Sequence, residues 1–312
     1  MVAFIIIASV LAVAIIGSLV FGVKYAHKMA FRPRPRGEQD HFRGTEPGGK
    51  TLNPELCREN INRLLNTPNE RVSVVSRDGL KLSGYYVRGR EGAPVMLCFH
   101  GHRSSWQRDF SGIAPILFDH GFNVIFVDQR SHGESEGELV SLGVLEKYDV
   151  LAWARYASER FGEESKIVLV GVSMGGASVL GATGLDLPKN VCAVISDSAF
   201  SSALEEAVYV GCKGGRMSPV ISSITRLSAR VYGFKLTEFT PKDALKECEL
   251  PILLLHSRED ALVPYYMAEE LFASAKRATL VAFDKGPHVC EGLLEPERYR
   301  RAYDNFFLEN NI

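Results

Sequence analysis

The sequence predicts an α/β fold, in which a mostly parallel sheet is covered by helices on both faces. Short apolar runs rich in β-branched residues indicate buried strands, and helical patterns such as residues 144–161 separate them. This alternation is typical of a parallel sheet. Residues 71–88 alternate apolar and polar side chains around Asp78-Gly79, which indicates an antiparallel hairpin. Six further strands, which bring the expected sheet to eight, are predicted at 94–99, 122–128, 166–171, 191–196, 251–256 and 279–283.

Composition places the chain among ordinary globular proteins. It has 312 residues, 46% of them hydrophobic and 23% charged, with a net charge of −1. This balance gives no indication of a nucleic-acid partner. Residues 51–312 are long enough for one large α/β domain.

The N-terminal segment predicts a membrane anchor. Val2 to Val23 carry no charge, and as a helix they would span about 33 Å, enough to cross the hydrocarbon core of a bilayer. A cleaved signal peptide is the alternative, but it requires basic residues before the apolar run, and none is present. We therefore expect an anchor at 1–23, a basic, polar linker at 24–50 and a body in the cytoplasm. The cytoplasmic location of the body is inferred from the basic residues that follow the apolar run: Lys24, Lys28, Arg32, Arg34 and Arg36.

Cysteine usage agrees with a cytoplasmic body. The six cysteines are widely spaced and none belongs to a C-x-x-C pair. Two of them, Cys98 and Cys192, lie in apolar strand-like runs, where a thiol behaves as a small hydrophobic group. Reduced thiols are therefore expected in preference to a disulfide framework.

A serine among glycines is the first candidate functional residue. In LVGVSMGGASV (169–179), Gly171 and Gly175 flank Ser173 at a predicted strand-to-helix turn. Such a sharp turn strains the corner residue, and flanking glycines remove the Cβ atoms that would collide there. The pattern is that of a G-x-S-x-G nucleophile elbow, which exposes the hydroxyl at the end of the strand. The alternative is a turn of small residues that packs a helix against a strand.

Partners for this serine follow later strands. A serine needs a base to take its proton and an acid to orient the base, and ligands of such sheets gather beyond the carboxyl ends of the strands. Asp260 follows the strand at 251–256, and His288 follows the strand at 279–283. Three such residues in the order Ser, Asp, His favour the nucleophile elbow. Asp197, which follows another strand, is the rival to Asp260.

From about Arg71 to Phe307 the chain resembles the α/β-hydrolases. It is similar to the group of serine hydrolases that holds monoglyceride lipases, esterases and prolyl aminopeptidases. Nothing similar to this family covers residues 1–70. The segments that carry the resemblance are CFHGHRSS (98–105), VDQRSHGESEG (127–137), GVSMGG (171–176), HSREDALVP (256–264) and GPHVCEGLLEPERY (286–299). One departure is His256-Ser257, where the group often has His-Gly.

The resemblance implies further parts of the site. It implies a helical cap inserted at about 198–248 and an oxyanion loop after the third strand. On this basis the backbone N–H groups of His102 and Met174 would bind the oxyanion. It also implies that Arg130 and His132 stabilise a loop beside the site.

Two other sets of residues have alternative interpretations. His100 and His102 form an H-x-H pair that could bind a metal, but no Asp-His follows, so neither a metal nor a cofactor is expected. Apolar cap residues could line an acyl pocket or pack the cap on the body: Val208, Tyr209, Val220, Ile221, Ile224, Tyr232, Phe234 and Phe239.

The sequence thus predicts a membrane-anchored serine hydrolase. Ser173 attacks a carbonyl, His288 moves the proton and Asp260 orients the imidazole. A carboxylic ester is the expected bond, and the anchor favours a small-molecule or lipid-like acyl substrate. One alternative is an amide or peptide, for which Glu205 and Glu206 are candidate amine ligands. The other is a non-catalytic binding protein on the hydrolase fold, which would have no need of an intact triad.

Overall fold

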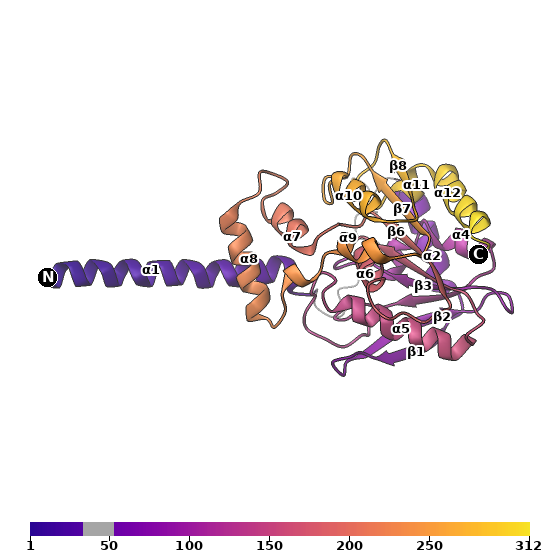
Figure 1. Ribbon diagram of the computed structural model, residues 1–312, viewed down its shortest axis with the longest axis horizontal. Coiled ribbons are helices and arrows are strands. Elements are labelled where there is room, and N and C mark those ends of the chain that lie inside the picture. Colours follow the sequence, from indigo (N-terminus) through magenta and orange to yellow (C-terminus); the bar gives the residue numbers. More distant parts are fainter. Residues whose placement is uncertain (34–52) are drawn as a thin grey trace.

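The computed structural model describes residues 1–33 and 53–312, and its body is built on one eight-stranded sheet (Figure 1). The strand order is β1-β2-β4-β3-β5-β6-β7-β8. β2 pairs antiparallel with both β1 and β4, and all other neighbours are parallel. The predicted α/β fold, the opening hairpin and the eight strands are confirmed. The strands are β1 (Glu70–Val75), β2 (Lys81–Val87), β3 (Val95–Phe99), β4 (Asn123–Val127), β5 (Ile167–Val172), β6 (Val191–Asp197), β7 (Ile252–Ser257) and β8 (Ala278–Phe283).

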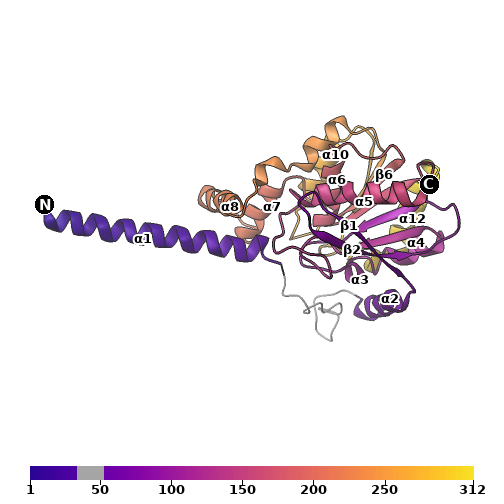
Figure 2. The same cartoon turned by 90° about the horizontal axis from the view of Figure 1, so that it is seen from below.

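Helices cover both faces of this sheet (Figure 2). Successive side chains of a strand point to opposite faces. In β3, Leu97 and Phe99 therefore join the core under α5, α6 and α10, whereas Met96 and Cys98 join the core under α4 and α12. The body helices are α2 (Pro54–Asn66), α3 (Trp106–Asp109), α4 (Ala114–Asp119), α5 (Glu146–Phe161), α6 (Met174–Ala182), α10 (Tyr266–Ser274), α11 (Glu291–Leu294) and α12 (Pro296–Glu309).

A helical cap connects β6 to β7, where the resemblance implies one. Ser218 caps α8 by accepting a hydrogen bond from the Ile221 N–H, and proline follows at the first helical position, as the sequence predicts. The helix predicted at Thr240-Pro241 is a single turn, α9. The cap consists of α7 (Ala203–Gly211), α8 (Pro219–Val231), η2 (Leu236–Glu238), α9 (Pro241–Ala244) and η3 (Leu245–Glu247).

The N-terminal segment is a helix that projects away from the body (Figure 1). α1 (Val2–Ala26) continues into a π-helical stretch, η1 (His27–Phe31), and Ile6–Phe31 is long and apolar enough to cross a membrane. The helix thus extends past the linker boundary expected at residue 24, because no glycine or proline interrupts it there. It ends at Arg32, which Pro33 holds in an extended conformation. Most of the expected linker lies outside the described residues.

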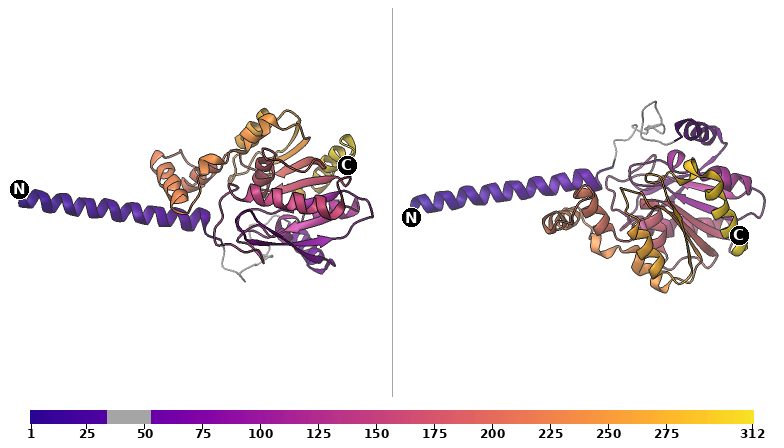
Figure 3. Two further views of the ribbon diagram at one scale, coloured as in Figure 1. Left: turned by 60° about the horizontal axis from the view of Figure 1, so that its bottom comes forward. Right: turned by 90° about the horizontal axis from the view of Figure 1, so that it is seen from above.

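The last turns of this helix pack against the cap, beside α8 (Figure 3). The Ser228 hydroxyl donates a hydrogen bond to the Val23 carbonyl at 3.0 Å. The rings of His27 and Tyr232 stack with their centroids 3.5 Å apart. Phe31 is fully buried and packs edge-on against Phe234 of the cap. α1 is therefore joined to the body by side-chain and backbone contacts.

Arg130, in the loop after β4, connects three parts of the body. Its guanidinium donates to both carboxylate oxygens of Asp149 on α5, at 2.6 and 2.7 Å. It also donates to Asp78 in the first hairpin, at 3.0 Å to each oxygen. The hydrogen bonds from Arg130 lower the pKa of Asp78 to about 2. Because Arg130 and Asp149 are buried, loss of either would leave an uncompensated charge in the interior.

We expect Arg130→Met to destabilise the body strongly. Breaking a buried ion pair costs about 3–5 kcal/mol, which corresponds to a fall of roughly 6 °C or more in the melting temperature of the full chain in detergent. Arg160→Met is the matched control, because the pair between Arg160 and Glu70 is solvent-exposed and should contribute about 1 kcal/mol or less. Equal melting temperatures for the two variants, followed by circular dichroism, would contradict the structural role of Arg130.

Candidate active site

Ser173 stands at a strained turn between β5 and α6. Its backbone has φ 55° and ψ −118°, a conformation that residues other than glycine rarely adopt. A Cβ atom on Gly171 would collide with the backbone of Gly175, and one on Gly175 would collide with the Phe99 carbonyl at the end of β3. Both glycines of the motif are therefore required by close backbone packing. The strand, turn and helix predicted from the sequence are present.

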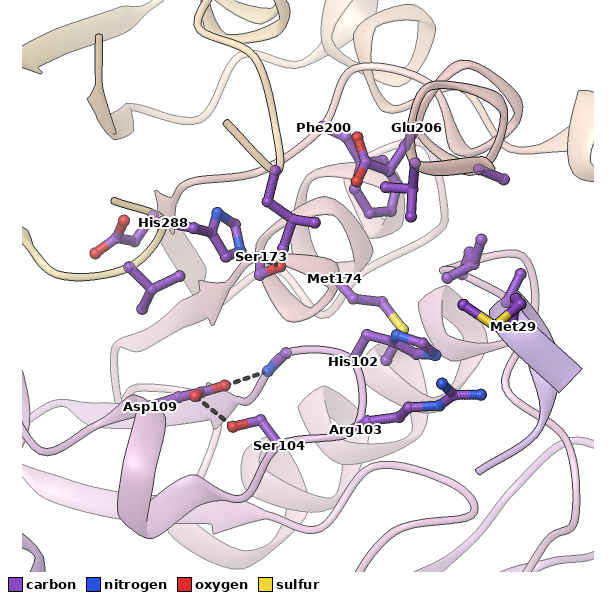
Figure 4. Close-up of a pocket in the computed structure, with 18 of the residues that line it drawn as sticks. Met29, His102, Arg103, Ser104, Asp109, Ser173, Met174, Phe200, Glu206 and His288 are labelled. Atoms are coloured by element: carbon purple, nitrogen blue, oxygen red, sulfur yellow. Dashed lines mark hydrogen bonds between the residues drawn. The ribbon is translucent and has the colours of Figure 1, made fainter. Parts of the chain in front are cut away.

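His288 joins Ser173 to Asp260. The imidazole of His288 points toward Ser173 (Figure 4), with Nε2 2.8 Å from Ser173 Oγ. Its Nδ1 lies 2.6 Å from Asp260 Oδ2. Because an ionised carboxylate only accepts, Nδ1 carries the proton and Nε2 accepts from the serine hydroxyl. The structure thus brings together the three residues that the sequence places after β5, β7 and β8. This arrangement allows His288 to take a proton from Ser173.

The surroundings of Asp260 keep it ionised. The carboxylate is buried, which would raise its pKa. The hydrogen bond from His288 and the electrostatic attraction of the charged imidazole outweigh this effect, so the pKa of Asp260 lies below its usual value. The other oxygen, Oδ1, accepts the N–H groups of Leu262 and Val263, both at 2.9 Å. Asp260 is thus fixed in position before it orients the imidazole.

Asp197, the rival acid, has other partners. Its carboxylate accepts hydrogen bonds from the hydroxyls of Tyr299 at 2.5 Å and Ser198 at 2.8 Å. Its backbone carbonyl accepts the N–H of Ser173 at 2.8 Å. Burial raises its pKa to about 6, although the two hydroxyls act in the opposite direction. His288 Nδ1 is bonded to Asp260, so the geometry favours Asp260 as the orienting acid.

The loop after β3 runs directly beside Ser173. A Cβ atom on Gly101 would lie 3.1 Å from the Cβ of Ser173. Asp109 holds this loop, because its Oδ2 accepts the Gly101 N–H at 2.6 Å and its Oδ1 accepts the Ser104 hydroxyl at 2.5 Å (Figure 4). Burial raises the pKa of Asp109, and these hydrogen bonds partly offset that effect. The sequence analysis missed Asp109, since no motif marks it.

His102 and Met174 both line the cavity at Ser173, where the resemblance implies an oxyanion hole. Met174 is the first residue of α6, so its N–H has no acceptor within the helix. The positive end of the helix dipole lies at the same point. These features suit an N–H group that stabilises developing negative charge.

His100 is engaged by the backbone on both sides of its ring. Nδ1 donates to the Gly101 carbonyl at 2.8 Å, and Nε2 accepts the Gln129 N–H at 3.2 Å. Burial lowers its pKa to about 4, so it is neutral. The H-x-H pair therefore has no ring nitrogen of His100 left for a metal. Within residues 1–33 and 53–312, no group of three or more potential ligands could hold one.

A cavity of about 500 Å³ extends from Ser173 to the cap and α1. Its walls include Phe200, Ile221 and Ile224, together with Tyr25 of α1 and Met29 of η1. Of the eight apolar cap residues that the sequence singles out, Ile221 and Ile224 line the cavity. The other six do not line it: Val208 is buried, Tyr209 is half-buried, Val220 is exposed, Tyr232 stacks on His27, and Phe234 and Phe239 are buried in the main core.

Glu206 brings a carboxyl group to the cavity wall, near Phe200 (Figure 4). It is 7% exposed, and its Oε2 has no hydrogen-bond partner among the described residues. Burial raises its pKa to about 8. Glu205, the other predicted amine ligand, does not line the cavity and faces Lys242 instead. A carboxyl in this environment is mainly neutral at pH 7.

Comparison with known proteins identifies the class. The family model of serine aminopeptidase, S33, matches residues 91–245. The esterase Pf2001 of Pyrococcus furiosus has the same fold, with a TM-score of 0.63 and 21% identity, over 79% of this chain and 93% of the esterase. The chain is therefore an α/β-hydrolase, as the resemblance implied.

Two curated relatives also align with this chain, each at low sequence identity. The uncharacterized protein YqkD of Bacillus subtilis is 22% identical over 303 residues, which cover 93% of this chain and 95% of YqkD. The lysophosphatidylserine lipase ABHD12 of Xenopus tropicalis is 25% identical over 205 residues, 59% of this chain and 47% of the lipase. Together these similarities support a hydrolase.

We expect Asp260→Asn and Asp197→Asn to behave differently. An asparagine at 260 favours the wrong imidazole tautomer, which costs on the order of 10⁴ in turnover of a serine triad. An asparagine at 197 still accepts the Tyr299 hydroxyl, so turnover should fall less than about tenfold, with a stability loss of about 1 kcal/mol. Hydrolysis of a p-nitrophenyl ester and thermal melting of both variants measure these effects. An exchange of the two behaviours would make Asp197 the orienting acid.

Proposed function

We propose that this protein is a membrane-anchored serine hydrolase that cleaves carboxylic esters through an acyl-enzyme. The observation that carries the proposal is the continuous hydrogen-bonded path from Ser173 Oγ through His288 to Asp260, at 2.8 and 2.6 Å. The path begins at a strained turn and ends on a carboxylate held by two N–H groups. A protein that only bound ligands would have no use for this arrangement.

In the acylation step, Ser173 Oγ attacks the ester carbonyl while its proton passes to His288 Nε2. Asp260 keeps the Nδ1 proton in place and stabilises the imidazolium. The carbonyl oxygen, now an oxyanion, faces the N–H groups of His102 and Met174. Collapse of this tetrahedral intermediate breaks the bond between the carbonyl carbon and the alcohol oxygen. The alcohol oxygen takes the proton from His288, and the acyl group remains on Ser173.

In the deacylation step, water replaces the alcohol. His288 takes one proton from the water, and the resulting hydroxide attacks the acyl carbonyl. The second tetrahedral intermediate releases the carboxylic acid, and Ser173 Oγ recovers its proton from His288. Ester and water are thus converted into acid and alcohol by the chain's own residues.

The cavity supports an ester with an apolar acyl group. Ile221, Ile224, Phe200 and Met29 supply apolar surface around the path to Ser173. Apolar lining of this kind favours ligands that bury hydrocarbon, and the cavity wall also carries charged side chains such as Arg108. The esterase among the structural neighbours and the lipase among the relatives support the same substrate class.

An amide or peptide with a free amine is the second candidate, because Glu206 places a carboxyl in the cavity and the matching family model is that of a serine aminopeptidase. The pKa of about 8 favours the ester, since an ammonium group is bound best by an ionised carboxylate. Parallel assays with p-nitrophenyl esters and aminoacyl 4-nitroanilides separate the two. Hydrolysis of the anilides that is lost in Glu206→Gln, while the esters are still cleaved, would establish the second candidate.

The membrane location rests on α1. Its side chains from residue 6 to residue 21 are exposed, as is suitable for contact with lipid. Gly22, Tyr25 and Ala26 of α1 form part of the cavity wall, so removal of α1 as a signal peptide would open the cavity. A membrane anchor that is not cleaved keeps this part of the cavity wall in place. Lys24, Lys28 and Arg32 follow the apolar run and favour a cytoplasmic body.

We expect a fluorophosphonate probe to label the wild-type chain at Ser173 and to leave Ser173→Ala unlabelled. The strained turn exposes this hydroxyl, and His288 makes it nucleophilic. Labelling is measured by in-gel fluorescence and located by peptide mass spectrometry. Labelling that persists in Ser173→Ala would mean that the nucleophile is elsewhere, and an unlabelled wild type would favour the binding-protein alternative.

We also expect the body to resist protease added outside intact spheroplasts, because the basic residues after the apolar run retain that side in the cytoplasm. Digestion should require permeabilisation of the membrane. An immunoblot against a C-terminal tag reports the result, with a periplasmic protein as the control for access. Digestion of the body in intact spheroplasts would show the opposite orientation.

A further inference from the structure

The cavity at Ser173 has one wall that belongs to the N-terminal helix. Gly22, Ala26 and Met29 line it from α1 and η1, opposite Ile221 and Ile224 of α8. Met29 is 49% exposed, so the cavity is open where the helix leaves the body. In Figure 4, Met29 lies across His102 from Ser173. The cavity thus leads from the serine to an opening beside α1.

The wall that α1 gives to the cavity begins where the apolar run of the helix ends. The uncharged segment stops at Val23, and Lys24 is the first basic residue. Gly22, one residue before this boundary, lies against α8, and a Cβ atom there would be 3.2 Å from Ile224 Cδ1. With α1 in a bilayer, α8 therefore lies at the membrane surface. The cavity wall begins at that same level, at Gly22, and continues to Met29 beside the opening.

The cap surface around this opening suits an anionic lipid surface. Residues 207–233 contain no acidic residue and four basic ones, and all four are exposed: Lys213, Arg216, Arg226 and Arg230. Large apolar side chains are exposed among them: Val210, Met217, Val220, Leu227 and Val231. Basic residues interleaved with exposed apolar ones are typical of segments that lie in the membrane interface. This cap surface is continuous with α1.

We propose that a lipid ester enters this site directly from the bilayer, between α1 and α8, and binds its acyl chain against α1. This inference rests on the proposed ester hydrolysis and extends it to the substrate class, a bilayer-resident ester of a long-chain fatty acid. The anchor is then a part of the substrate-binding site as well as an attachment. The acyl chain then passes from the hydrocarbon core of the bilayer into the cavity at Ser173 without crossing water. The ester carbonyl reaches Ser173 at the inner end.

The first experiment compares two glycines of α1 in the full chain, reconstituted in vesicles that contain anionic phospholipid. Gly22→Phe places a ring into the close contact with Ile224 at the cavity wall, whereas Gly17→Phe adds the same side chain where nothing lies within 4 Å. Each variant is assayed with monooleoylglycerol in the vesicles and with dissolved p-nitrophenyl acetate. The measured quantity is the ratio of the two kcat/KM values.

We expect Gly22→Phe to lower this ratio at least about tenfold, the effect of losing space for about two methylene groups. Gly17→Phe should keep the wild-type ratio within about twofold. A ratio that stays at the wild-type value in Gly22→Phe, or that falls equally in both variants, would overturn the lipid route. Absence of p-nitrophenyl acetate hydrolysis and of fluorophosphonate labelling in the wild type would instead overturn the proposed function.

A second measurement needs no substitution. A long-chain alkyl fluorophosphonate with a terminal diazirine is bound to Ser173 of the wild-type chain in the same vesicles and then irradiated. We expect the crosslink in peptides of residues 20–31 or 219–231. Crosslinks confined to the sheet-facing side of the cavity, such as Phe200, would show that the chain takes another path.

Discussion

Close backbone packing at the end of β5 is the constraint on which the site depends. Gly175 lies so near the end of β3 that no side chain fits between them, and Gly171 packs equally closely on the first turn of α6. The chain can turn there only if Ser173 takes a positive φ, which directs its side chain away from the sheet. The loop after β3 is brought alongside by the same packing. The strain at Ser173 is stabilised by the surrounding core.

Different surroundings give the buried carboxylates near His288 different tasks. Asp260 receives N–H donors and the imidazole, so it is ionised and can orient a base. Asp197 receives the Tyr299 and Ser198 hydroxyls, which hold it away from the imidazole Nδ1, although its pKa of about 6 leaves it mainly ionised at pH 7. Glu206 lacks a partner for one oxygen and tends to be neutral. Of these three carboxylates, only Asp260 is hydrogen-bonded to the imidazole, and so it alone is placed to support proton transfer.

The sequence predicted the parts of this site that depend on local pattern. The eight strands, the turn at Ser173 and the loops that carry Asp260 and His288 follow from periodicity and from glycine spacing, which short segments determine. Asp109 was not predictable, because its two hydrogen bonds to the loop of Gly101 depend on how α3 packs. The contact between Val23 and Ser228 joins residues far apart in the chain, so no local signal marks it. For the same reason, the sequence did not separate the apolar cap residues that line the cavity from those that pack elsewhere, such as Tyr232 and Phe234, which contact His27 and Phe31.

The joint between α1 and the cap has a mechanical consequence. Flexible linkers isolate an enzyme from the tilt of its anchor, but here Val23, His27 and Phe31 attach the helix to the cap by a hydrogen bond and by ring contacts. A transmembrane helix changes its tilt when the hydrophobic thickness of the bilayer changes. With α1 in a bilayer, such a tilt moves one wall of the cavity relative to Ser173. If α1 is the membrane anchor that we propose, the acyl composition of the membrane acts on the shape of the site through this tilt, and the lipid is then both the solvent of the anchor and a control on the proposed hydrolysis.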